Sequence, residues 1–229
     1  MKIGILQTGH VPDELVDEHG PYLDMFSKLL DGHGFSFTNY AVVDNEFPSS
    51  VDEMDGWLIT GSRHGAYEDL EWIPTLEDFI REAYEANIPT IGICFGHQIM
   101  AQALGGKVEK YSGGWSVGHT DYDLEGEDGK SLLAMHQDQV TEIPEEATVI
   151  ASNKFCAYAG LAYKKNALSF QPHPEFTPEF TESLIRARAG TIVPQEIADE
   201  ALAKINNPND SKKMADKMAG FFKERRQNK

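Results

Sequence analysis

The stretch TIGICFGHQIMAQALGG, residues 90–106, places one cysteine at the point where an apolar run ends and a helical pattern begins. The run at 89–93 is short and apolar, which predicts a buried strand, and 97–104 has helical spacing and ends at two glycines. The cysteine, Cys94, lies in a Gly-x-Cys-x-Gly pattern between these two elements. This pattern is typical of a sharp strand-to-helix turn that holds a nucleophile at the edge of a sheet.

Cys94 would have physical reasons to be reactive on such a turn. The flanking Gly92 and Gly96 remove the Cβ atoms that would clash where the backbone passes closely. The partial positive charge at the start of the helix favours the thiolate, and the N–H of Phe95 can bind an oxyanion. The pattern alone is equally compatible with a small buried cysteine in a glycine-rich connection. The second cysteine, Cys156 in NKFCAYAG, has no comparable context and is expected in the core.

Composition narrows the class of protein. The chain has 229 residues, of which 41% are hydrophobic and 25% charged, as in a globular domain. Its formal net charge of −17 repels phosphate backbones, so we expect no nucleic-acid partner. No run of about 18 apolar residues and no signal-peptide pattern is present, so no membrane association is expected. Two cysteines do not form a disulfide framework, which favours the reducing cytoplasm.

Strands and helices alternate in the first half of the chain. Apolar or alternating runs predict strands at 2–7, 35–43, 56–60 and 89–93. Helical spacing predicts helices at 21–34, 74–87 and 97–104. Such alternation with short connections predicts an α/β fold, with an open, mainly parallel sheet covered by helices on both faces.

The second half has a different pattern. Short strand-like runs dominate from about 107 to 170, and some are expected to pair antiparallel. Helical spacing then follows at 178–190, 194–205 and 211–226. We predict one domain, 1–190, with a helical C-terminal extension, 191–229, packed on it. The apolar stripe of the last helix is either part of a helical cap or a contact surface for a partner or second copy; it comprises Met214, Met218, Phe221 and Phe222.

A cysteine nucleophile needs a base, and His173 is the best candidate among the eight histidines. It lies in SFQPHPEF between Pro172 and Pro174, which stiffen the loop after a strand-like run. Glu175 is two positions further, on the same side of an extended segment, where its carboxylate can orient the imidazole toward the sulfur. His97 begins the helix and should point away from the sulfur. No two histidines have a metal-ligand spacing, so no metal site is predicted.

These elements together resemble the triad type of the class I glutamine amidotransferase family. GICFGHQIMAQALGG is followed later by HPEF, and LITGS at 58–62 resembles the glycine-containing loop that precedes the nucleophile in that family. The resemblance covers roughly residues 1–180 and implies a flavodoxin-like fold. It implies that Cys94 is the nucleophile, His173 the general acid and base, and Glu175 the group that orients the histidine.

The resemblance also implies which residues hold the substrate. The N–H groups of Gly61 and Phe95 would form an oxyanion hole. Four further residues would contact the substrate or line its site: Gln98, Gly114, Trp115 and His136. Gln98 and the YSGGWSVG segment would face the amino-acid end of glutamine, and His136 the site mouth.

The implied reaction is hydrolysis of the γ-amide of glutamine or a γ-glutamyl compound through a γ-glutamyl thioester, without metal or organic cofactor. Full amidotransferases pass ammonia to a synthetase, and the helical residues after HPEF are too few for an ATP-using domain. Either a separate synthetase subunit receives the ammonia, or the chain acts alone as a γ-glutamyl peptidase. A non-catalytic binding or regulatory protein on the same fold is the third interpretation. Homo-oligomerisation is compatible with each of the three.

Overall fold

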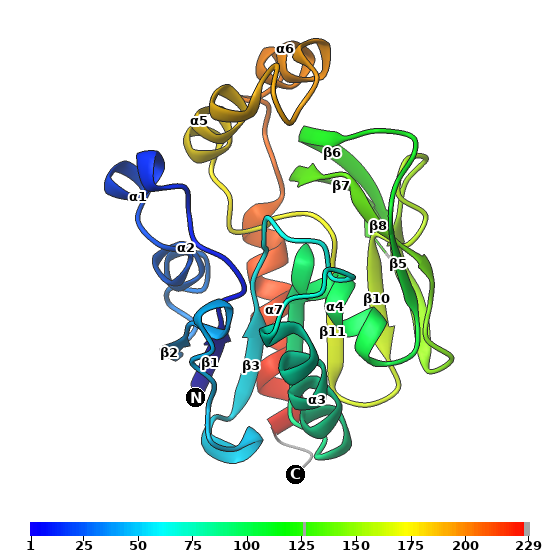
Figure 1. The fold of residues 1–229 in the computed structure, drawn as a ribbon. Helices are drawn as coiled ribbons and strands as arrows, with labels where there is room; N and C mark the ends of the chain where they lie inside the picture. Colours follow the sequence, from blue (N-terminus) through cyan, green and yellow to red (C-terminus); the bar gives the residue numbers. More distant parts are fainter. Residues whose placement is uncertain (126, 227–229) are drawn as a thin grey trace.

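The computed structural model describes residues 1–125 and 127–226, which form one large mixed sheet covered by helices (Figure 1). Nine strands in these residues make the sheet, in the order β2-β1-β3-β4-β11-β10-β9-β6-β7. The first five strands of this order pair in parallel: β2 (Ser36–Tyr40), β1 (Lys2–Leu6), β3 (Gly56–Ile59), β4 (Thr90–Ile93) and β11 (Ala167–Phe170). The predicted fold class is therefore confirmed.

The remaining strands pair antiparallel. They extend the sheet through β10 (Gly160–Tyr163), β9 (Ala147–Ser152), β6 (Ser116–Leu124) and β7 (Glu127–His136). A separate two-stranded sheet joins β5 (Lys107–Lys110) to β8 (Asp138–Glu142). Most of β7 and all of β8 were not predicted as strands, because their polar residues interrupt the alternation on which a strand assignment rests.

Two layers of helices cover the parallel strands. Along β3, the side chains of Trp57 and Ile59 enter one hydrophobic core and that of Leu58 enters the other, as the two-residue period of a strand requires. The first core is closed by α3 (Trp72–Glu85) and α4 (Phe95–Ala103). The second is closed by α2 (Tyr22–Leu29) and α7 (Ser211–Arg226).

The helix boundaries differ from the predictions by up to five residues, most at the end of α2, which stops at Leu29 rather than at residue 34. α3 begins at Trp72, two residues before the expected Pro74, and α4 begins at Phe95 rather than His97. α1 (Asp13–His19) was not predicted, because it is only seven residues long and buries one side chain, Leu15. α5 (Pro178–Arg188) and α6 (Gln195–Ala203) follow the expected ranges within three residues.

The apolar stripe of α7 belongs to the core. Its four side chains, Met214, Met218, Phe221 and Phe222, are all buried against the parallel strands and α2, so the interpretation as a partner-contact surface is wrong. Residues 227–229 of the expected extension lie outside the described residues. In the two described ranges, no helix is long and apolar enough to cross a bilayer.

Removal of one of these rings should weaken the whole fold. Phe222 is fully buried and packs edge-to-face on Phe35 at a centroid distance of 5.9 Å. We expect Phe222→Ala to lower the free energy of unfolding by about 3–5 kcal/mol in urea titrations, because it removes a ring and leaves a cavity. The control Lys212→Ala, at an exposed position of α7, should change it by less than about 0.5 kcal/mol. Equal changes in the free energy of unfolding for Phe222→Ala and Lys212→Ala would contradict the packing of Phe222 in the core.

Candidate active site

Cys94 occupies a tight turn at the carboxyl end of β4. It has φ 53° and ψ −102°, a conformation that costs a non-glycine residue about 1–3 kcal/mol. Hydrogen bonds hold the backbone on both sides of it. The N–H of Cys94 donates to the carbonyl of Phe170 at 2.8 Å, and the N–H of Gly96 donates to the carbonyl of Thr60 at 3.1 Å. The surrounding sheet therefore maintains an unfavourable conformation at the one cysteine that follows a parallel strand.

The two flanking glycines are required by close backbone contacts. A Cβ atom on Gly92 would lie 2.4 Å from the carbonyl oxygen of Gly96, and one on Gly96 would lie 2.4 Å from that of Ile59. Backbone atoms of packed elements cannot move aside as a flexible side chain can. The sequence-based explanation of the Gly-x-Cys-x-Gly pattern is therefore confirmed.

His173 and Glu175 follow the end of β11 and contact one another. The imidazole Nδ1 lies 2.7 Å from Oε1 of Glu175, and the backbone N–H of His173 donates to the carbonyl of Leu133 at 2.8 Å. The ring of Phe176 stacks on the imidazole, with centroids 3.8 Å apart and planes 6° from parallel. The histidine ring is thus fixed by a carboxylate at its edge and an aromatic ring on its face.

Gly61 lies beside both Cys94 and His173. A Cβ atom on Gly61 would be 2.8 Å from Cε1 of His173 and 3.7 Å from Cβ of Cys94, so these segments meet at one point. Burial alone would lower the pKa of His173, but the Cys94 thiolate and the Glu175 carboxylate outweigh it and hold this pKa above its usual value. The arrangement favours the protonated imidazole of His173 between Cys94 and the Glu175 carboxylate.

Two backbone N–H groups near the sulfur have no acceptor among the residues that the structure describes. Among the described residues no hydrogen bond is donated by the N–H of Gly61, whose own carbonyl accepts from Thr8 Oγ1 at 3.0 Å and from Thr60 Oγ1 at 3.1 Å. Phe95 is the first residue of α4, where an N–H has no acceptor within the helix. Both groups expected to form an oxyanion hole are therefore available as donors.

Gln171 is a further residue at the sulfur, and it was missed in the sequence. Its Nε2 lies 3.6 Å from Sγ of Cys94, and its Oε1 accepts from Nε2 of Gln98 at 3.1 Å. Gln98 also donates to the carbonyl of Asp138 at 2.9 Å, so its amide N–H groups are used within the protein. The only available signal for Gln171 was its position two residues before His173, on the same side of an extended segment.

A cleft of about 800 Å³ opens over Cys94. Three of the four residues expected at the substrate line it: Gln98, Trp115 and His136. Gly114 does not line it; this glycine has φ 97°, and a Cβ atom there would meet nothing within 4 Å. Its neighbour Trp115 lines the cleft, whereas the glycine lies in the turn that precedes β6.

His136 presents a hydrogen-bond acceptor near the cleft. Its Nδ1 lies 3.2 Å from the carbonyl of Asp138, and its Nε2 is buried with no hydrogen-bond partner among the described residues. Burial lowers the pKa of His136 to about 4, so the ring is neutral at pH 7. With the proton on Nδ1, which donates to that carbonyl, Nε2 keeps its lone pair.

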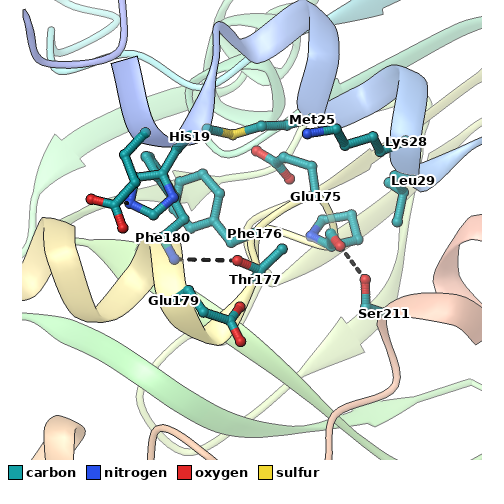
Figure 2. A pocket seen from close by; sticks show the side chains of 12 residues that line it. His19, Met25, Lys28, Leu29, Glu175, Phe176, Thr177, Glu179, Phe180 and Ser211 are labelled. Carbon is teal, nitrogen blue, oxygen red and sulfur yellow. Dashed lines mark hydrogen bonds and ion pairs between the residues drawn. The ribbon is translucent and has the colours of Figure 1, made fainter. Parts of the chain in front are cut away.

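A second hollow, of about 520 Å³, is lined by Glu175 but not by Cys94 (Figure 2). Its walls come from α1, α2, the Pro174–Phe180 segment and Ser211 of α7, and Figure 2 shows the Thr177 hydroxyl accepting from the N–H of Phe180 at the start of α5. We place the reaction in the first cleft because the sulfur lines that cleft and not this hollow.

Cys156 and His97 are both buried away from the cleft. Cys156 is buried, and burial raises the pKa of its thiol to about 12. His97 is fully buried, its Nδ1 lies 2.8 Å from Oγ of Ser169, and burial lowers its pKa to about 3. Cys156 was expected in the core, and His97 was expected to point away from the sulfur; His97 does not line the cleft. No group of three or more His, Cys, Asp or Glu side chains within the described ranges is placed to hold a metal ion.

Comparison with known proteins identifies the family. A model of the family described as "Glutamine amidotransferase class-I" matches residues 26–188, which is more than half of the chain. The chain belongs to the class I glutamine amidotransferase family. The match spans Gly61, Cys94, His173 and Glu175 and ends at the last residue of α5.

The relatives of this chain differ in the share of their own length that aligns with it. "Gamma-glutamyl peptidase 4" of Arabidopsis thaliana is 32% identical over 90% of this chain and 89% of its own. A "Probable GMP synthase [glutamine-hydrolyzing]" of Leptospira interrogans is 30% identical over 72% of this chain but only 28% of its own. A solved glutamine amidotransferase of Thermotoga maritima has the same fold, with a TM-score of 0.70, 21% identity and 99% of each chain covered.

Proposed function

We propose that this protein hydrolyses γ-glutamyl amide bonds, with Cys94 as nucleophile, His173 as general acid and base, and Glu175 as the group that orients the histidine. The observation that carries the proposal is the meeting of three segments at Gly61, which borders both Cys94 and the His173–Glu175 pair. A cysteine in a strained turn, an oriented histidine and free N–H donors are the parts that acyl transfer needs.

The chemistry follows from these groups. The Cys94 thiolate attacks the γ-carbonyl carbon, and the N–H groups of Gly61 and Phe95 stabilise the oxyanion that forms. The C–N bond then breaks as His173 gives its proton to the leaving amine, which leaves a γ-glutamyl thioester. Water, giving a proton to His173, attacks the thioester carbon. Glutamate leaves, and the thiolate–imidazolium pair is restored.

We further propose that the chain acts alone as a γ-glutamyl peptidase rather than as an ammonia-producing subunit. The relative named gamma-glutamyl peptidase aligns over nearly its whole length, whereas the GMP synthase contains much more than this chain. A cleft of about 800 Å³ is near the upper end of the ~300–1,000 Å³ usual for small-molecule sites. It accommodates a leaving group larger than ammonia.

A substrate panel with mass-spectrometric detection tests this function. Glutamine, a γ-glutamyl dipeptide and a γ-glutamyl alkylamide are each incubated with the protein, and free glutamate is measured. We expect the dipeptide to give the highest kcat/KM. If glutamine is the only one of the three that releases glutamate, and does so only after cell extract is added, the result would instead support a separate synthetase partner. Release from none of the three, with or without extract, would support the non-catalytic interpretation.

A further inference from the structure

The register of the parallel strands places Gln171 beside the Cys94 turn. β11 and β4 pair with Phe170 opposite Ile93, and the N–H of Cys94 donates to the carbonyl of Phe170 at 2.8 Å. Gln171 is the next residue along the chain, at the edge of the sheet where Cys94 lies. Its own N–H donates to the carbonyl of Ala159, just before β10, at 2.8 Å. Hydrogen bonds to the segments on either side therefore fix the backbone at this point.

The side chain of Gln171 faces α4. Phe170 packs in the second core, and its neighbours along an extended chain face the opposite way. Ser169 does so, because its Oγ lies 2.8 Å from Nδ1 of His97 in α4. Gln171 continues this row: its side chain is fully buried, and its Nε2 lies 3.6 Å from Sγ of Cys94. The amide thus contacts the sulfur from inside the protein.

The orientation of the Gln171 amide follows from its partners. Nε2 of Gln98 donates to the backbone carbonyl of Asp138 at 2.9 Å, and a carbonyl oxygen can only accept. The second hydrogen of this Nε2 is donated to the Gln171 amide at 3.1 Å, so the atom that receives it must be the amide oxygen. The other end of the amide, which faces the sulfur, is then the N–H₂ group. A hydrogen-bond donor, and not a lone pair, is therefore presented to the sulfur.

A donor in this position favours the thiolate of Cys94 over the neutral thiol. An ionised acceptor forms stronger hydrogen bonds than a neutral one, so the N–H group stabilises the anion more than the thiol. Burial strengthens the interaction, because little water competes for the donor. His173 gives its proton to the leaving amine, whereas an amide does not ionise during the reaction. The N–H of Gln171 is therefore present at every step, including the one that releases the thiolate from the thioester.

We propose that Gln171 is a further catalytic residue, whose amide N–H hydrogen-bonds the Cys94 thiolate, and that Gln98 is the residue that positions this amide. The inference rests on the proposed hydrolysis and adds a group that acts on its nucleophile. It also gives Gln98 a role within the protein, since both hydrogens of its Nε2 are donated to Asp138 and Gln171. Only Oε1 of Gln98 then remains for the substrate contact that was expected of this side chain.

Alkylation of Cys94 tests this role without any substrate. The rate at which iodoacetamide modifies Cys94 in the full-length protein is measured by mass spectrometry as a function of pH, because only the thiolate reacts. We expect Gln171→Leu to move the midpoint of this profile up by about one pH unit, a tenfold loss of thiolate below both midpoints. Gln171→Glu should move it at least as far, because it keeps the acceptor for Gln98 but places a carboxylate beside the sulfur. Gln98→Leu should cause a smaller upward shift, because the Gln171 amide is then no longer held in one orientation.

Gln139→Leu is the matched control. Gln139 is buried like Gln171 and donates from Nε2 to the carbonyl of Phe155 at 3.1 Å, but it does not line the cleft. Its loss should leave the midpoint unchanged, although a buried hydrogen bond is removed. A midpoint that stays in place in either folded Gln171 variant, or that moves equally in Gln139→Leu, would overturn the inference. A midpoint that depends on Gln171, in a protein that hydrolyses none of the three substrates of the panel, would refute only the proposed function.

Discussion

Cys94→Ala is expected to lower kcat for γ-glutamyl hydrolysis by at least about 10⁴-fold, because no other group near the cleft can form the thioester. Alanine keeps the Cβ atom and the backbone conformation of residue 94, so the variant should fold. The reaction is followed as glutamate released from the best substrate of the panel. Cys94→Ser should be similarly inactive, since a hydroxyl does not ionise as a thiol does.

The second cysteine provides the matched control for this experiment. Cys156 is buried in the core and does not line the cleft, so Cys156→Ala should retain kcat while losing some stability. Turnover that persists in Cys94→Ala, with no loss beyond that of the Cys156 variant, would refute the nucleophile and with it the proposed mechanism.

Glu175→Gln should have the next largest effect, a fall in kcat of about 10²–10⁴-fold, as expected when an orienting carboxylate becomes an amide. The carboxylate side chain is fully buried and accepts from Nδ1 of His173 at 2.7 Å. A glutamine can present its N–H₂ group instead, which would select the wrong tautomer. The exposed Glu179, four residues further on, gives the control Glu179→Gln, which should keep full activity.

The pH profile distinguishes an orienting role for Glu175 from a purely structural one. Burial lowers the pKa of His173, and the Cys94 thiolate and Glu175 carboxylate together hold it above its usual value. Without the carboxylate this pKa falls, so His173 loses its proton at lower pH. We expect the alkaline limb of kcat/KM to move to lower pH in Glu175→Gln. An unshifted limb together with a lowered melting temperature would indicate a structural role only.

Local patterns predicted much of this molecule. The strands at the parallel centre were found because they are short apolar runs between helices. Cys94, His173 and Glu175 were found because their neighbours restrict the backbone: glycines flank the cysteine, and prolines flank the histidine. The contact between His173 and Glu175 joins residues two positions apart, so sequence spacing was sufficient to expect it.

Features that depend on distant segments were not predictable in the same way. Gln171 reaches Cys94 across 77 positions of sequence, and nothing near it marks it as a site residue. The stripe of α7 had two interpretations until its packing on the sheet was known. Gly114 and Trp115 were both expected at the substrate, but the sequence of a glycine-rich loop does not show which of its residues face the site. Of the two, only Trp115 lines the cleft.

The sequence by itself determined the fold class and singled out the proposed nucleophile and its proposed base, because each is encoded by residues close together in the chain. Only the tertiary structure decided which further side chains surround the sulfur. Gln98 and Gln171 are 73 positions apart in the chain, and folding joins their amides beside Cys94. Such contacts depend on distances between segments remote in sequence, and the sheet and its covering helices set those distances.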